Sequence, residues 1–482
     1  MNARKLRHGL CGILSRWVGM GSAVLLASCM VGPDYHRPST PVPTRYKELS
    51  AIPVGWKDAA PADDLNRGNW WSIYDDPVLS DLAAKVAIDN QNLKAYEAAY
   101  RQAVALADEA RSSLYPSVSL APNVTRSRAP SGTSARSIGG TGAIRTLTIG
   151  TAWDLDLWGK IRRQIQSNRA AAEAGAAQLA SARLSAQAEL VTDYFQLRYE
   201  DSLQHLLRET VTAYERTLAI TRNQYAAGIA ARSDVVAAET QLQTTQSQSI
   251  AVGVSRAQYE HAIALLIGQS AADIDIPVAQ LAATVPVIPV TIPSALLERR
   301  PDIAEAERTV AQENALIGVA VAAYYPDISL SGLFGYAGSP ATTLISASNR
   351  TWSAAANGNQ VLFDGGARSA SVLAARAAYD QSVANYRQTV LTAFHDVEDA
   401  LSNLRILGEQ AEAQARAVAL SMEGAEIALH EYEAGTQAYT AVVTAQATAL
   451  ANEETQLQIA ASRLTSSVAL VKAMGGGWSR GS

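Results

Sequence analysis

The chain has 482 residues, a formal net charge of −5 and only two cysteines. Alanine, Gln, Ser, Glu and Arg are abundant and there are four Phe, a composition that favours long, closely packed helices over a bulky globular core. The acidic balance argues against nucleic-acid binding, which needs basic patches. No internal stretch supplies the roughly 18–20 consecutive apolar residues of a membrane helix.

The first 28 residues predict a signal peptide. Four basic residues precede or begin a short apolar run, Trp17–Ala27, which is too short to span a bilayer. The run ends in LASC, which resembles a bacterial lipobox, so we expect cleavage before Cys29 and lipidation of Cys29 with diacylglycerol and palmitate. An ordinary signal peptide with a chance cysteine is the alternative. Cleavage would shift the net charge from −5 to −9, because it removes four positive charges, and would also remove Cys11. No thiol would then remain for a disulfide.

Residues 29–75 are rich in proline at first and predict a lipid-anchored tether followed by an equatorial segment. A helical pattern runs from about Asp76 to Leu114. Tyr115-Pro116 then ends it, because a proline and the residue before it both resist helix.

Two β-hairpins are expected, at 117–157 and 327–363. Their strands are predicted at 117–128, 144–157, 327–338 and 351–363, the last with poor alternation. In the second strand Leu147, Ile149, Trp153, Leu155 and Leu157 share one face, whereas Asp154 and Asp156 share the other. Ile328, Leu330, Phe334 and Tyr336 share a face in the third. Each strand is long enough to cross a bilayer when tilted.

A long helical hairpin is predicted after each β-hairpin, at 160–267 and 367–474. The first breaks at Gly228 and the second at Gly435. Val383, Val390, Val397 and Leu404 recur every seven residues, with Phe394 and Leu401 between them, which predicts coiled-coil packing.

These elements form a tandem duplication. Residues 114–120 (LYPSVSL) return as 324–330 (YYPDISL), and the echo continues in both helical hairpins at offsets of about 206–210 residues. We therefore expect a first repeat at 76–270, a proline-rich linker at 271–293, a second repeat at 294–474 and a tail at 475–482. Strands in lipid can cross only as a closed barrel, which four strands cannot form, so membrane-crossing strands would require an oligomer.

Several motifs together resemble the TolC-type outer-membrane efflux proteins, in their lipoprotein (NodT-like) branch. They are VGPDY at 31–35, WWSIYDDP at 70–77, LERRPDI at 297–303, FHDVEDAL at 394–401 and GGGW at 475–478. The resemblance covers nearly the whole mature chain. It implies an α+β membrane protein: a homotrimer with a twelve-stranded β-barrel, four transmembrane strands per chain, and a periplasmic α-barrel of long coiled-coil helices.

The resemblance also implies a function and partners. The protein would be the outer-membrane, lipid-anchored channel of a tripartite efflux system that extends into the periplasm. It would conduct drugs or other small toxic compounds passively from an inner-membrane pump and a periplasmic adaptor, with a role in antibiotic resistance. No cofactor, metal or catalytic residue is implied.

Two sets of site residues follow from the same resemblance. Adaptor-contact tips are expected at the Tyr-x-x-Gly turns, at Gly228, Ile229, Ala230, Gly435, Thr436 and Gln437. A periplasmic gate is expected around Tyr432, Glu431 and Thr444. Relatives commonly have a basic residue at the position of Glu431 and an aspartate at that of Thr444, so either weaker contacts hold this gate or the match shifts locally.

Alternative functions have less support from the sequence. His395, Glu398 and Asp399 share one helix face and could bind a metal, but the family motif explains the acids without one. A non-transporting coiled-coil lipoprotein of the envelope is the main alternative to a channel. A hydrolase would need a nucleophile–base set, which the sequence lacks. Asp154 and Asp156 could bias a pore toward cations, although a solvated face is the simpler interpretation.

Overall fold

The computed structural model describes residues 30–40, 43, 46–48, 68–128, 141–282, 284–286, 288 and 299–476. The signal peptide and Cys29 therefore lie outside the described residues. The chain divides into two compact units, each assembled from both halves of the sequence. Unit 1 comprises residues 1–39, 100–175 and 306–386, and unit 2 comprises 40–99, 176–305 and 387–482.

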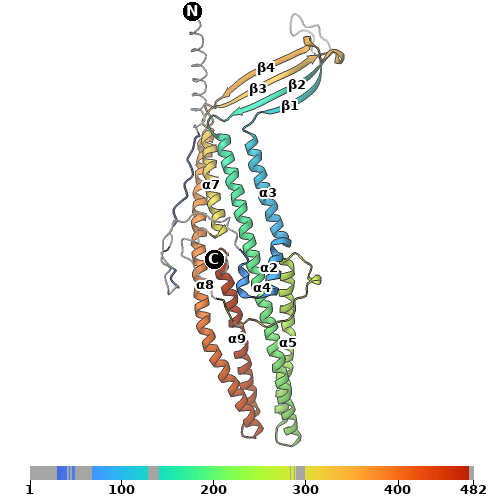
Figure 1. Ribbon diagram of the computed structural model, residues 1–482, viewed down its shortest axis with the longest axis vertical. Helices are drawn as coiled ribbons and strands as arrows, with labels where there is room; N and C mark the ends of the chain where they lie inside the picture. The colour runs from blue at the N-terminus through green and yellow to red at the C-terminus, as the bar shows by residue number, and fades with distance from the viewer. Residues whose placement is uncertain are drawn as a thin grey trace, which may run out of the picture. The chain divides into compact units, whose positions relative to one another are not determined.

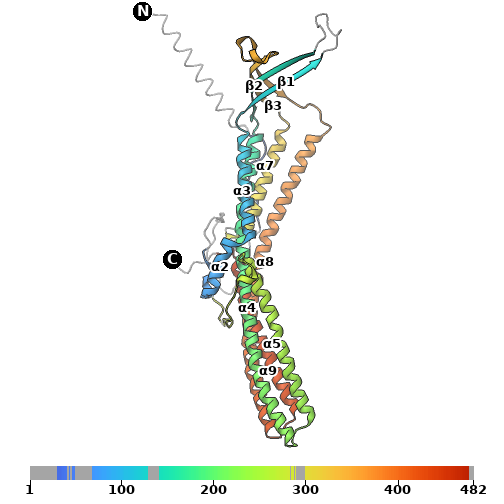
Figure 2. The ribbon, with the colours of Figure 1, turned by 90° about the vertical axis from the view of Figure 1, so that its right-hand side faces the viewer.

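The helices of the two repeats match in length. Helices α4 (Lys160–Ala226) and α8 (Ala367–Glu433) each have 67 residues, and α5 (Arg232–Leu266) and α9 (Tyr439–Ala473) each have 35. Both pairs are predicted by the sequence at nearly these bounds. Figures 1 and 2 show α4 with α5, and α8 with α9, as two helical hairpins; the parts of α4 and α8 that follow residues 175 and 386 belong to unit 2 with α5 and α9. In α8 the predicted seam is buried or half-buried, with Val390 and Val397 at 0% exposure.

Shorter helices precede each β-hairpin. The first repeat begins with η1 (Trp70–Tyr74), α2 (Pro77–Asp89) and α3 (Gln91–Ser112), and the second with α7 (Pro301–Ala322). The single predicted helix at 76–114 is thus two helices divided at Asn90, whose side chain caps α3 through the N–H of Leu93 and donates to the carbonyl of Leu266. The remaining 3₁₀ turns are η2 (Ala271–Asp273), η3 (Ala341–Thr343) and η4 (Ala347–Asn349).

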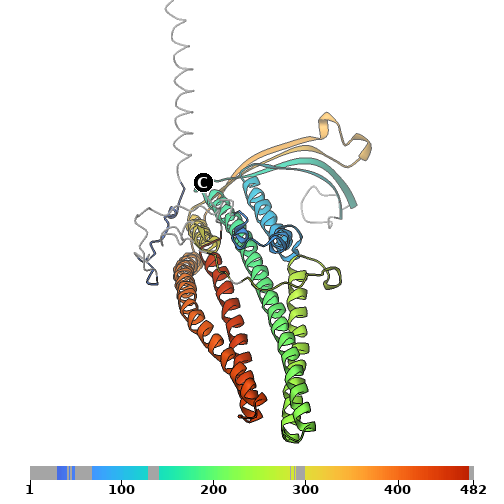
Figure 3. The ribbon, with the colours of Figure 1, turned by 60° about the horizontal axis from the view of Figure 1, so that its bottom comes forward.

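Unit 1 contains one antiparallel sheet in the order β1-β2-β3-β4 (Figure 1). Its strands are β1 (Ser117–Arg128), β2 (Thr141–Leu155), β3 (Asp327–Gly338) and β4 (Arg350–Asn359). The two predicted hairpins are joined because β2 also pairs with β3, with Ile149 opposite Phe334. Figure 3 shows the four strands as a curved layer.

Strands β2 and β4 end earlier than predicted because helix caps begin there. The Asp156 carboxylate accepts the N–H groups of Ile161 and Arg162, at 2.9 and 3.0 Å, and so serves the start of α4. Asp364 serves α8 in the same way, through the N–H groups of Gly366 and Arg368. Residues 156–157 and 360–363 of the predicted strands are therefore outside the sheet.

The core of unit 2 gathers around η1 and α2. Trp70, Leu79 and Tyr194 are almost completely buried there. Asp76 caps α2 by accepting from the N–H groups of Val78 and Leu79, and Tyr194 donates its hydroxyl proton to the same carboxylate. The WWSIYDDP motif thus has a structural role.

Candidate functional site

The sheet of unit 1 has one apolar face. Residues that pair across strands share a face, and one such row crosses all four strands with its side chains 47–73% exposed: Leu120, Ile149, Phe334 and Trp352. Neighbouring rows add Leu147 opposite Tyr336, and Trp153 opposite Leu330. The predicted shared faces of the second and third strands are therefore confirmed within the sheet. An exposed apolar surface of this width is suited to contact with lipid or protein.

The other face of the sheet is polar or has small side chains. One row contains Ala121, Thr148, Gly335 and Thr351, and another contains Asp154, Ser329 and Asn357. Alternation with a period of two places these residues opposite the apolar rows. A sheet that is apolar on one side and polar on the other can separate lipid from water.

Both edges of the sheet are open. Over the described residues, β1 pairs only with β2 and β4 only with β3. Each outer strand therefore presents backbone N–H and C=O groups that have no ladder partner within the chain. In lipid, backbone groups at such edges would have to be paired. None of the described helices is both long enough and apolar enough to cross a membrane.

The two helical hairpins turn in the same way. After α4, Gly228 has a φ of 75° and the N–H of Ile229 reaches back to the carbonyl of Gln224 at 2.9 Å. After α8, Gly435 has a φ of 74° and the N–H of Thr436 reaches the carbonyl of Glu431 at 2.9 Å. This αL turn at the helix end requires glycine. The predicted tip residues are all exposed, except that Ala230 is half-buried.

The two hairpins pack against each other just behind these turns. Their shared cluster contains Tyr214, Leu218, Val235, Ala238, Leu242, Tyr432, Tyr439 and Val442. The rings of Tyr432 and Tyr439 meet edge to face at 5.1 Å. Burial raises the pKa of both phenols, that of Tyr439 to about 12, so both remain neutral near pH 7.

The predicted gate residues do not form one cluster. Tyr432 is 6% exposed, whereas the Glu431 and Thr444 side chains are exposed, and the Thr444 hydroxyl donates to the carbonyl of Thr440. The Tyr432 hydroxyl lies beside Thr221, but within the described chain it makes no hydrogen bond of ordinary geometry. Its main neighbour, Tyr439, was missed from the sequence, although an aromatic residue four positions after the turn glycine was a signal for it.

The other acidic and basic motifs have structural partners. Arg300, from LERRPDI, donates to Asp302 at 2.6 Å and to Asp396, from FHDVEDAL, at 2.9 Å. Glu398 accepts the backbone N–H groups of Lys47 and Glu48. The described residues contain no group of three or more His, Cys, Asp or Glu side chains that could hold a metal ion.

Several carboxylates on the helices of unit 2 are desolvated. Burial, followed by the neighbouring charge of Glu189, raises the pKa of Asp193 to about 6. Burial also raises the pKa values of Glu200 on α4 and of Glu453 and Glu454 on α9. Ionising these groups near neutral pH therefore costs free energy in the folded state.

Asp193 should consequently make stability depend on pH. Its folded pKa is above the unfolded value, so the free energy of unfolding should fall as pH rises from about 4 to 6 and then level off. Asp193→Asn should raise the melting temperature at pH 7.5. It should also reduce the increase in melting temperature that the wild type shows when the pH is lowered from 7.5 to 5. We expect the substitution to change the free energy of unfolding by about 1 kcal/mol or less, because solvent screens this partly exposed group. Melting curves at both pH values test this, and an unchanged pH difference would contradict it.

The comparisons with known proteins agree with this geometry. Residues 82–269 and 292–476 match the outer membrane efflux protein family. The chain belongs to this family. It is 30% identical over 470 residues to the outer membrane protein OprJ of Pseudomonas aeruginosa, covering 95% of each chain. It is 29% identical to the probable efflux pump outer membrane protein TtgC of Pseudomonas putida, covering 95% of this chain and 94% of the relative.

Solved structures agree on the fold. The outer-membrane channel OprN superimposes with a TM-score of 0.86 at 29% identity, over 93% of this chain and all of OprN. The Campylobacter jejuni CmeC outer membrane channel superimposes with a TM-score of 0.84 at 23% identity, over 94% of this chain and 96% of CmeC. The predicted fold class is confirmed. Like its family, the protein is an outer-membrane efflux channel component that extends into the periplasm and works with other components of an efflux system. Such channels are not enzymes.

Proposed function

We propose that three copies of this chain form the passive exit duct of a tripartite efflux system. The observation that carries the proposal is the four-stranded sheet with one apolar face, one polar face and two open edges. Three such sheets, with β4 of one copy beside β1 of the next, make a closed twelve-stranded barrel whose apolar face meets lipid and whose polar face meets water. The long hairpins of unit 2 then form the helical part of the duct.

The partners are an inner-membrane pump, which supplies the energy, and a periplasmic adaptor. We place the adaptor contacts at the exposed tips: Gly228, Ile229, Ala230, Gly435, Thr436 and Gln437. We propose that the transported compounds are small and toxic, and that many of them are apolar. Three relatives support this, because their names refer to antibiotic, toluene and solvent efflux. Cys29 is proposed to carry the lipid anchor.

The closing contact is proposed at Tyr432, with Glu431 and Thr444 nearby on the same hairpin. Its packing against Tyr439, in an apolar cluster to which both hairpins contribute, supports a gate held by aromatic and apolar contacts rather than by charge pairs. Such a contact would depend little on ionic strength, because salt screens charges and not apolar packing.

The tips provide a direct test of this function. A side chain at Gly228 or Gly435 meets no atom within 4 Å, so Gly435→Leu should cost only about 1–3 kcal/mol of backbone strain and leave the assembly intact. Blocking the adaptor contact should nevertheless reduce drug efflux by tenfold or more, measured as the drug concentration that stops growth.

Gly424→Leu is the matched control, because Gly424 also has open space but lies within α8 away from the turn. We expect near-normal efflux from this variant. Full resistance with Gly228→Leu and Gly435→Leu, in cells that contain normal amounts of trimer, would refute the assignment of the tips.

A further inference from the structure

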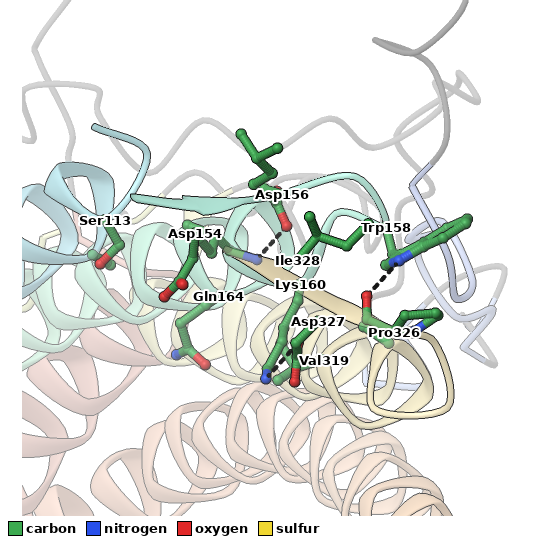
Figure 4. Close-up of a pocket in the computed structure, with 14 residues that line it drawn as sticks. Ser113, Asp154, Asp156, Trp158, Lys160, Gln164, Val319, Pro326, Asp327 and Ile328 are labelled. Atoms are coloured by element: carbon green, nitrogen blue, oxygen red, sulfur yellow. Dashed lines mark hydrogen bonds and ion pairs between the residues drawn. The ribbon is translucent and has the colours of Figure 1, made fainter. Parts of the chain in front are cut away.

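Unit 1 contains a cavity at the foot of the sheet, between the sheet, the first turns of α4 and the last turns of α3 and α7 (Figure 4). Its volume is about 470 Å³, within the range of sites that hold drug-sized molecules. Strands β2 and β3 and helices α3, α4 and α7 all contribute to the lining. One chain therefore supplies the whole wall.

The charged groups around the cavity are not equivalent. Asp156 is occupied by the N–H groups at the start of α4 and by the Arg162 side chain. Asp327 forms an ion pair with Lys160 at 3.6 Å. The Asp154 carboxylate makes no hydrogen bond or ion pair with any other described residue, and Figure 4 draws no such contact to it.

Asp154 also belongs to the polar face of the sheet, in register with Ser329. The helices contribute apolar side chains to the lining, among them Ile161 and Val319. The lining contains three carboxylates and one lysine, so the negative charges outnumber the positive one and disfavour an anionic occupant. A metal ion would need several oxygen ligands that are free to coordinate it, and only one lining carboxylate is free.

We propose that this cavity is a transit site for compact organic cations with an apolar body, which the duct would load at the foot of its barrel. The proposal rests on the proposed function, because it requires the polar face of the sheet to line the duct. The apolar body lies against Ile161 and Val319, and the cationic nitrogen faces the Asp154 carboxylate. Neutral solutes of similar size would lack the second contact.

Ethidium is a suitable probe, because it is a compact apolar cation whose fluorescence reports binding. Titration of the detergent-purified, assembled protein at low salt should show saturable binding. Asp154→Asn keeps the side-chain shape and should weaken binding roughly three- to tenfold, since it removes the one free charge. Val319→Asn should also weaken binding, through the apolar wall. Asp380→Asn removes an exposed carboxylate of unit 1 outside the cavity and should bind like the wild type.

Salt provides a second signature. Raising the sodium chloride concentration should weaken ethidium binding to the wild type more than to Asp154→Asn, because only the wild type has the charge contact. Absence of saturable binding, or equal affinity in wild type, Asp154→Asn and Val319→Asn, would overturn the transit site. Conductance of the same preparation in planar bilayers separates the two claims. If the protein forms an open pore but shows no saturable binding or no effect of the substitutions, only the transit site is refuted. If it forms no pore, the proposed duct is refuted.

Discussion

Asp201→Asn is expected to destabilise unit 2 by about 3–5 kcal/mol, because it removes the central charge of a buried ion network. The Asp201 side chain is 0% exposed and accepts from Arg198 and Arg256, both at 2.8 Å. Arg198 is itself 3% exposed, so it would become a buried charge without its carboxylate.

The same network holds the connector between the two repeats. Asp201 accepts the N–H of Ala279 at 3.1 Å, while Arg198 and Arg256 donate to the carbonyls of Pro277 and Ile276. Loss of the Asp201 charge should therefore weaken these contacts with the connector, in addition to lowering the melting temperature. Hydrogen exchange at residues 276–281 should accelerate strongly, because these amides lose protection by local opening.

Asp81→Asn is the appropriate control for this variant. Asp81 pairs with Lys85 at 2.6 Å, but the two side chains are 65% and 40% exposed. An exposed i,i+4 pair contributes only about 0.3–0.5 kcal/mol. Equal melting temperatures for the two variants, with unchanged protection of the connector, would contradict a structural role for the network.

Arg163→Ala is expected to release the segment that follows the lipidation site. The Arg163 side chain is 3% exposed and donates to the carbonyls of Val31 and Gly32 and to the Asp34 carboxylate, at 3.0–3.1 Å. Gly32 lies so close to α7 that an added Cβ would be 2.5 Å from the Cα of Gly318. Residues 31–34 are therefore fixed against α4 and α7.

Without Arg163, two carbonyls in this segment lose their donor. A buried acceptor left unpaired costs about 1–3 kcal/mol, but Val31 is only half-buried and Gly32 is exposed, so the detached state should become roughly tenfold more populated. Chymotryptic cleavage after Tyr35, whose hydroxyl otherwise donates to the Glu307 carboxylate, should accelerate accordingly. Mass spectrometry of the fragments measures this rate.

Arg111→Ala serves as the control, because Arg111 is an exposed residue of unit 1 near the end of α3. Chymotryptic cleavage after Tyr35 should stay at the wild-type rate in this variant. If Arg163→Ala also leaves that rate unchanged, the segment is held by other contacts. Arg163→Lys should resemble the alanine variant, since one ammonium cannot reproduce the fixed fork of a guanidinium.

Local patterns were sufficient for much of the fold. The seven-residue spacing from Val383 to Leu404 and the glycines at 228 and 435 predicted the helices and their turns, because both signals are carried by neighbouring residues. The alternation in β2 and β3 predicted which face is apolar for the same reason.

Non-local partners could not be predicted in this way. Pairing of β2 with β3 joins segments almost 200 residues apart, and no local rule specifies it. The contact of Arg300 with Asp396 and that of Glu398 with residues 47 and 48 link separate motifs. Similarly, apolar residues predicted that β2 and β4 extend to residues 157 and 363, but both strands end before the helix caps at Asp156 and Asp364.

The gate illustrates the same limit. The resemblance to the family predicted a gate at positions 431 and 444, where relatives commonly have charged residues. In this chain the side chains at both positions, Glu431 and Thr444, are exposed. The contact that the structure provides is between Tyr432 and Tyr439, across the turn of one hairpin. The apolar cluster that buries it depends on how the two hairpins pack.

The native mass of the detergent-extracted protein tests the central claim most directly. The unprocessed chain has a mass of 51.0 kDa, and a barrel built from four strands per chain requires three chains. The account predicts a particle with three protein chains and none with one. A stable monomer that keeps its sheet would contradict it, because both edges of that sheet would then remain unpaired.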